Sequence, residues 1–197
     1  MTKVKQGWLA GLVLVPMLAL IGCSSMPLST MYKMAKMNPL EVAPEQLVVA
    51  VTSPQDIGVR SGDVVLSMTF RSDVPEMNLN YRFFVQVDKQ YPVPPALKQQ
   101  LNANDKITVL RLSDSDAKQM REALAKIRAY RQEHDEGAGS MNLELVSACS
   151  LTTIVDTKAE LSVYLKLATN EAFFPFLEDL AVNDLQQLSV CDTKPNV

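Results

Sequence analysis

Residues 78–88 read NLNYRFFVQVD, and they alternate between apolar and polar side chains. The apolar row is Leu79, Tyr81, Phe83, Val85 and Val87, and the polar row is Asn78, Asn80, Arg82, Gln86 and Asp88, with Phe84 interrupting it. Successive side chains of a strand point to opposite faces, so a period of two with one polar face is typical of half-buried antiparallel strands. The stretch therefore predicts one strand of an antiparallel sheet.

Similar patterns occur on both sides of this stretch. Further strands are expected at 47–52, 64–71, 106–112, 140–149 and 160–168. Runs of strands with few helices between them favour an antiparallel sheet or a β-sandwich, whereas a parallel α/β fold needs a helix between most strands. We therefore predict an α+β fold that is mainly antiparallel β, with one long amphipathic helix and an N-terminal signal segment.

The long helix is expected to begin after Ser113, whose hydroxyl suits an N-cap. Met120, Leu124 and Ile127 share one face of this helix, so they form its inner stripe. Gly137 is a natural stop, because glycine adopts the left-handed conformation that ends many helices. The acidic residues near that end oppose the helix dipole, so the last turn is expected to fray.

The last forty residues carry a weaker signal. Residues 171–185 predict a second helix, interrupted by Pro175, because proline breaks a helix interior. Residues 187–191 predict a short final strand. Phe173, Phe174 and Phe176 are the densest aromatic cluster; they either close one end of the sheet or contact a lipid, ligand or partner.

The N-terminal segment has a basic start and an uncharged core. Lys3 and Lys5 precede 14 uncharged residues, Trp8 to Ile21. A membrane-spanning helix needs about 20 apolar residues to cross the hydrocarbon layer. A short apolar core behind a basic start is instead typical of a cleavable export signal.

The end of this segment, Leu20-Ile21-Gly22-Cys23, resembles the lipobox of bacterial lipoprotein precursors. The resemblance implies cleavage between Gly22 and Cys23, with fatty acyl chains on Cys23. Two or three acyl chains give stable membrane anchoring. Ser24 is similar to the residue that follows the lipidated cysteine in outer-membrane lipoproteins. An ordinary signal peptide, or an anchor helix with an incidental cysteine, remains the alternative.

On this interpretation the chain has three parts. Residues 1–22 are a signal peptide, 23–46 a lipidated tether and 47–197 a single β-rich domain. In the tether, Met31, Met34 and Met37 are spaced to share one face of a short helix. That helix either rests on lipid or a partner, or packs against the domain.

Two cysteines remain in the domain, Cys149 and Cys191. Exported domains sit in an oxidising compartment, where an even pair of cysteines usually forms a disulfide. Cys149 continues the inward series of Met141, Leu143 and Leu145, so its sulfur is expected in the core. The bond would close a loop of about 43 residues and contribute roughly 4 kcal/mol in the chain-entropy model. Two buried free thiols are the alternative.

Composition excludes some functions. Without Lys3 and Lys5 the chain keeps 17 basic and 22 acidic residues, so nucleic-acid binding is not expected. His134 is the only histidine, and its acidic neighbours point in different directions on a helix, so they do not form a metal site. No cofactor motif is present. The carboxylates of Asp56, Asp63, Asp73 and Glu76 are expected in solvated turns.

These observations lead to three hypotheses. The first is a non-catalytic, membrane-anchored envelope lipoprotein that faces the periplasm and binds or helps assemble another envelope protein. Its partner surface would be the polar row Asn78, Asn80, Arg82 and Gln86, or a sheet edge. The second is a lipid- or small-ligand-binding module with an apolar cavity. The third, weaker one is a carboxylate-dependent cell-wall hydrolase.

Overall fold

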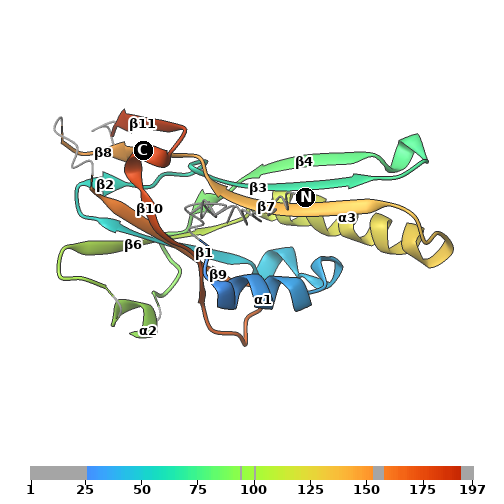
Figure 1. Cartoon of the computed structure of the whole chain (residues 1–197), viewed down its shortest axis with the longest axis horizontal. Coiled ribbons are helices and arrows are strands. Elements are labelled where there is room, and N and C mark those ends of the chain that lie inside the picture. The colour runs from blue at the N-terminus through green and yellow to red at the C-terminus, as the bar shows by residue number, and fades with distance from the viewer. Residues whose placement is uncertain (1–25, 94, 100, 153–157, 192–197) are drawn as a thin grey trace, which may run out of the picture.

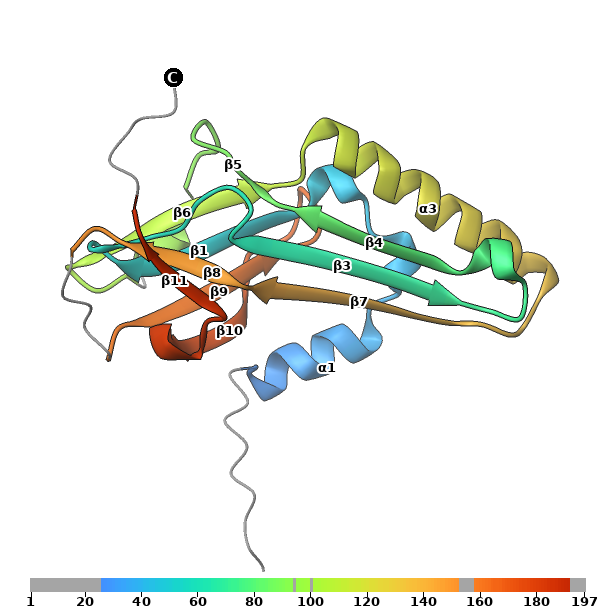
Figure 2. The same cartoon turned by 90° about the horizontal axis from the view of Figure 1, so that it is seen from above.

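A computed structural model describes residues 26–93, 95–99, 101–152 and 158–191 of the 197-residue chain. The predicted signal peptide, Gly22 and Cys23 lie outside the described residues. Within the described residues, no helix combines the length and apolar character that crossing a membrane requires. The α+β class with antiparallel sheets and one long helix is confirmed, and the arrangement of its elements is shown in Figures 1 and 2.

The largest sheet has five strands in the order β10-β9-β1-β6-β5, all antiparallel to their neighbours. The strands are β1 (Val48–Pro54), β5 (Gln86–Val87), β6 (Asp105–Arg111), β9 (Glu160–Lys166) and β10 (Phe174–Ala181). The central strand β1 begins with an unbroken apolar run, and its first four residues are at most 3% exposed. Such a run is expected where both faces of a strand are covered.

A second sheet has the order β4-β3-β7 and is also antiparallel. Its strands are β3 (Val64–Arg71), β4 (Leu79–Phe84) and β7 (Ala138–Leu145). Leu66 pairs with both Phe83 and Leu143, so three large apolar side chains lie next to one another on the inner face. The long helix α3 (Asp114–Glu133) runs along this sheet, on the β4 side in Figure 2.

A third sheet, in the order β11-β8-β2, joins the other two at one end of the molecule (Figure 1). Its strands are β2 (Ile57–Gly58), β8 (Ser147–Ser150) and β11 (Gln187–Val190), and β11 is parallel to β8. The described residues also contain short helical turns: η1 (Pro39–Glu41), η2 (Pro44–Gln46), η3 (Pro75–Met77), α2 (Pro95–Lys98) and η4 (Val182–Asp184).

Two predicted strands are each divided between two sheets. The stretch 78–88 forms β4 and β5 with a break at Val85, and 140–149 forms β7 and β8 with a break at Val146. At the first break, the backbone N–H of Val85 donates to Val64 and its carbonyl accepts from Gly62. The alternation of buried and exposed side chains continues through Val85, so the sequence pattern does not reveal the change of sheet.

The long helix is placed as predicted. The hydroxyl of Ser113 accepts a hydrogen bond of 3.1 Å from the backbone N–H of Asp116, so it caps the first turn. Met120, Leu124 and Ile127 are all at most 3% exposed and form the inner stripe. The helix ends at Glu133, before the expected stop at Gly137, and residues 134–137 form the turn into β7.

The predicted helix over 171–185 is wrong. This segment forms β10, which pairs with β9, followed by the turn η4. Pro175 is tolerated because β10 is an edge strand, where a missing N–H costs no ladder bond. Phe176 is buried, and Phe174 packs against the core, so these two side chains help to close the sheet end.

The predicted tether helix is present as α1 (Leu28–Lys36) and packs on the domain. Thr30 is buried, and its hydroxyl donates to the carbonyl of Pro175 on β10. Met34 and Met37 pack against the main core, whereas Met31 is 49% exposed. The methionine row is therefore divided, with two side chains facing the domain and one facing outward.

The predicted disulfide is confirmed. Cys149 on β8 bonds to Cys191, just after β11, with Cα atoms 4.8 Å apart. Cys149 is 1% exposed, as the inward series predicts. Gly58 on β2 lies against the bond, where a Cβ atom would be 2.9 Å from both sulfurs. The bond therefore ties the C-terminal strand to the middle strand of the third sheet.

We expect Cys149→Ala together with Cys191→Ala to lower the free energy of unfolding by about 4 kcal/mol, because the loop between them is no longer closed in the unfolded chain. Urea unfolding followed by circular dichroism measures this difference. Cys23→Ala is the matched control and should leave the unfolding curve unchanged. A double variant within about 1 kcal/mol of the parent would show that the bond does not stabilise the fold.

Candidate functional site

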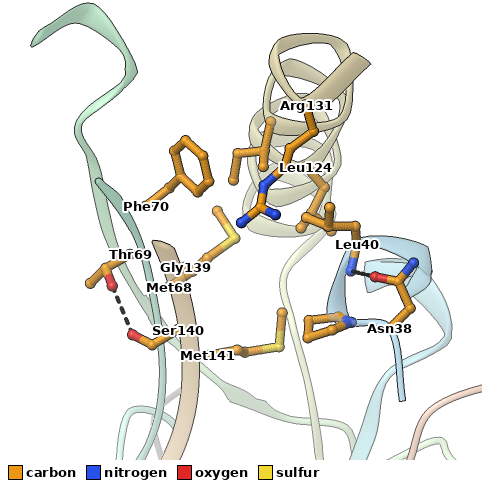
Figure 3. Close-up of a pocket in the computed structure, with 12 residues that line it drawn as sticks. Asn38, Leu40, Met68, Thr69, Phe70, Leu124, Arg131, Gly139, Ser140 and Met141 are labelled. Carbon is orange, nitrogen blue, oxygen red and sulfur yellow. Dashed lines mark hydrogen bonds between the residues drawn. The ribbon is translucent and has the colours of Figure 1, made fainter. Parts of the chain in front are cut away.

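A groove of about 240 Å³ lies between α3 and the β4-β3-β7 sheet (Figure 3). The turn η1, which follows α1, forms its third wall. The lining residues are Asn38, Pro39 and Leu40 of the η1 segment, Met68, Thr69 and Phe70 of β3, Leu124, Ile127 and Arg131 of α3, and Gly139, Ser140 and Met141 of β7. The groove exists because a straight helix covers only part of the inner face of the sheet.

The walls of the groove are mainly apolar. Met68 and Phe70 come from the inner face of β3, and Leu124 and Ile127 come from the inner stripe of α3. Phe70 meets Tyr130 of α3 edge-on behind this wall, with ring centroids 5.8 Å apart. All five side chains are at most 9% exposed, and their positions are therefore fixed by core packing.

Two arginines of α3 contact the walls of the groove, and one of them, Arg131, lines it. Arg131 donates from Nη2 to the carbonyl of Gly137 over 2.7 Å, and its guanidinium carbon is 5.7 Å from the centre of the Phe70 ring. Arg128 donates to the carbonyl of Leu40, which fastens η1 to α3. These contacts hold two walls together and place positive charge beside an apolar surface.

Strand β7 borders the groove and is an edge strand. Among the described residues it pairs only with β3, through the full register from Val64–Leu145 to Arg71–Ala138. Natural sheets usually protect edges with lysine, proline or a bulge. β7 reads AGSMNLEL, has neither lysine nor proline, carries one charged residue, Glu144, near its end, and exposes Ala138, Gly139 and Ser140. A strand without such protection can accept another strand beside it.

The predicted partner surface spans two sheets, and all four of its side chains are exposed. Asn80 and Arg82 are exposed on the outer face of β4, as the alternation predicts. Asn78 lies in the turn before β4, where its side-chain oxygen accepts from the backbone N–H of Ser72 over 3.0 Å. Gln86 lies on β5 in another sheet and donates to the carbonyl two residues before it. Two of the four side chains therefore have local structural roles.

The candidate carboxylates have different surroundings. Asp63 is 4% exposed, so the expectation of a solvated turn is wrong for this residue. Its carboxylate accepts from the hydroxyl of Ser147 over 2.6 Å, which joins the start of β3 to β8. Asp73 and Glu76 are exposed near η3, and Asp56 lies at another end of the fold. The structure assigns Asp63 to the scaffold.

The single histidine also has a packing role. His134 ends α3, and its ring stacks on Tyr130 with centroids 4.4 Å apart. Its Nδ1 is 3.7 Å from a carboxylate oxygen of Glu136. Among the described residues, no three His, Cys, Asp or Glu side chains lie close enough together to hold a metal ion.

A second, polar hollow of about 520 Å³ lies at the end of the five-stranded sheet. Its acidic residues are Asp56, Asp105, Glu160, Glu178 and Asp179. Burial raises the pKa of Tyr164 in its wall, and the negative charges of Glu178 and Asp179 raise it further. Nearby, burial lowers the pKa of Lys106, and the charge of Asp56 opposes part of that change. Most residues that line this hollow are polar, unlike those of the groove.

The groove and its edge were not found from the sequence. The inward row Met141, Leu143 and Leu145 was visible, but whether β7 is an edge strand depends on pairing across the whole chain.

Comparison with known proteins adds no relative: no protein-family model matches the chain, and neither curated proteins nor solved structures give a match. The groove residues therefore carry the functional interpretation by themselves.

Gly137 lies against the ring of Phe70, which lines the groove. Its φ of +109° disfavours any side chain, and a Cβ atom there would be 2.6 Å from the Phe70 ring. We expect Gly137→Ala to lower the free energy of unfolding by about 2 kcal/mol. In the control Gly139→Ala, the nearest contact would be 3.3 Å, and the loss should stay below about 1 kcal/mol. Urea unfolding measures both. Equal losses would contradict the expected difference between the two positions.

Proposed function

We propose that this chain is a membrane-anchored envelope lipoprotein that binds a segment of another envelope protein along β7. The observation that carries the proposal is the edge of β7, which no strand of the described residues covers and which lies directly beside the apolar groove. The anchor is Cys23, with its acyl chains in the outer membrane and the domain in the periplasm. The protein acts as a binding or assembly accessory and not as a catalyst.

The chemistry of the site favours an extended segment. An added strand gains backbone hydrogen bonds along β7, and every second side chain points toward the same face of the sheet. On the inner face those side chains would enter the groove, next to Met68, Met141 and Leu124. Arg131, which lines the groove, favours a partner with an acidic residue beside its apolar ones.

A lipid- or small-ligand-binding function is the second candidate. The apolar lining of the groove supports it, because ligand sites are usually concave and apolar with a few polar groups. The volume of about 240 Å³ is small for a whole lipid, but it accommodates part of an acyl chain. In the first candidate function a partner protein contacts Met141, and in the second a lipid or small ligand does.

The anchor is tested at Cys23. We expect Cys23→Ala to leave the precursor uncleaved and without acyl chains, because position 23 then has no thiol that can be modified. Mass spectrometry of the membrane fraction and flotation with membranes measure this change. Cys191→Ala is the matched control and should be cleaved and lipidated like the parent. An identical mass and identical fractionation for Cys23→Ala would reject the anchor.

The partner site is tested by photo-crosslinking in cells. A photoreactive amino acid replaces Met141 in the groove or Asn142 on the edge, and the control position is Asn80 on the outer face of β4. We expect one protein to be crosslinked from 141 and from 142, with a yield about tenfold lower from 80, because only the first two positions border the site.

Other outcomes separate the alternatives. Lipid crosslinked from Met141, without protein from either β7 position, would favour the ligand-binding function. A protein crosslinked from Asn80 and not from β7 would move the partner surface to the polar row of β4. Either result would reject binding along β7.

A further inference from the structure

The outer face of α1 is unusually apolar for a helix exposed to solvent. Leu28 is 83% exposed, Met31 49% and Tyr32 64%. These residues and Ala35 are spaced at i, i+3, i+4 and i+7, so they form one stripe along the helix. Large apolar side chains gathered in one stripe mark a surface that contacts something else.

The stripe cannot turn inward, because the opposite face of α1 is fixed. Thr30 is buried and bonds to β10, and Met34 and Met37 pack against the core. Lys33 pairs with Glu171 over 3.1 Å, and its ammonium lies 4.0 Å from the centre of the Phe174 ring. The domain therefore holds the stripe outward.

We propose that the stripe of Leu28, Met31, Tyr32 and Ala35 lies on the surface of the bilayer and gives the domain a second membrane contact. This inference rests on the proposed anchor at Cys23. Four residues lie between Cys23 and Leu28, and the five Cα–Cα steps that join them reach at most about 18 Å when fully extended. An acylated Cys23 thus keeps α1 beside the membrane whatever path the chain takes.

The charges of α1 fit a bilayer surface. The helix contains no acidic residue, and of its two lysines Lys33 is paired with Glu171 whereas Lys36 lies beside the stripe. The ammonium of Lys36 lies 4.2 Å from the centre of the Tyr32 ring, which places a cation at the border of the stripe. Helices that lie in a membrane interface combine an apolar face with flanking lysines that attract anionic lipids.

A bilayer contact at α1 orients the binding site. The turn η1 follows α1 directly and forms one wall of the groove. Figure 2 shows α1 on the β7 side of the sheet, whereas α3 lies on the β4 side. With both the acyl chains and the stripe in contact with lipid, the β7 edge is held at a fixed height above the membrane.

A tryptophan reporter tests this inference. Trp8 is the only tryptophan and precedes Cys23, so a chain that begins at Cys23 has none and keeps every described element. In that chain the disulfide leaves Cys23 as the only free thiol. Coupling Cys23 to a maleimide lipid in vesicles replaces the natural anchor, so failure of lipidation in cells does not affect the result.

Tyr32→Trp places the reporter in the stripe, and Phe84→Trp is the control on exposed β4. The vesicles contain brominated phosphatidylcholine and roughly one fifth phosphatidylglycerol. We expect bromine to quench the tryptophan at 32 at least about threefold more than that at 84, because an interfacial helix buries its apolar face about 5–10 Å deep.

Charged substitutions complete the test. Leu28→Glu together with Met31→Glu should remove the quenching of the tryptophan at 32, whereas Leu188→Glu together with Val190→Glu, at exposed positions on β11, should leave it unchanged. Equal quenching at 32 and 84, or quenching that persists in the first double variant, would overturn the membrane contact.

Discussion

The packing of α3 against the inner face of β3 is the constraint on which the site depends. A straight helix cannot cover all three strands of a twisted sheet, and α3 lies toward β4, so its apolar stripe packs against Phe70 of β3 and leaves β7 partly open. Phe70, Leu124 and Ile127 are buried by this contact, yet the same side chains form the walls of the groove. One interaction therefore builds the core and defines the shape of the open surface.

The sequence predicted those elements whose signal is local. The alternation in 64–71, the cap at Ser113 and the stripe that includes Leu124 depend only on neighbouring residues, and the structure confirms them. The break at Val85 was not predictable, because the alternation continues while the pairing partner changes. Pro175 was misleading for a related reason: proline ends helices and also fits edge strands, and only the pairing with β9 decides between them.

The candidate site was harder to predict than the fold. A period of two identifies which residues share a face, but it does not separate a binding surface from local structural roles such as that of Asn78, whose side-chain oxygen accepts a hydrogen bond from the backbone N–H of Ser72. The edge position of β7 is set by strand pairing over the whole chain, so no residue of 138–145 reveals it. Asp63 illustrates the same limit. Its place in a turn of the sequence predicts a solvated carboxylate, but the fold brings Ser147 beside it, and the hydroxyl of Ser147 donates to that carboxylate.

The two faces of α1 explain why Met31, Met34 and Met37 do not share one role. Met34 and Met37 gain stability from the core, whereas Leu28 and Tyr32 remain in water in the isolated domain. Transfer of an exposed side chain of this size into an apolar phase is worth about 1.5–3 kcal/mol. That energy is too small to hold a protein at a membrane by itself, but a tether of a few residues greatly raises the local concentration of lipid. Under those conditions a weak contact is sufficient to set the orientation of an anchored domain.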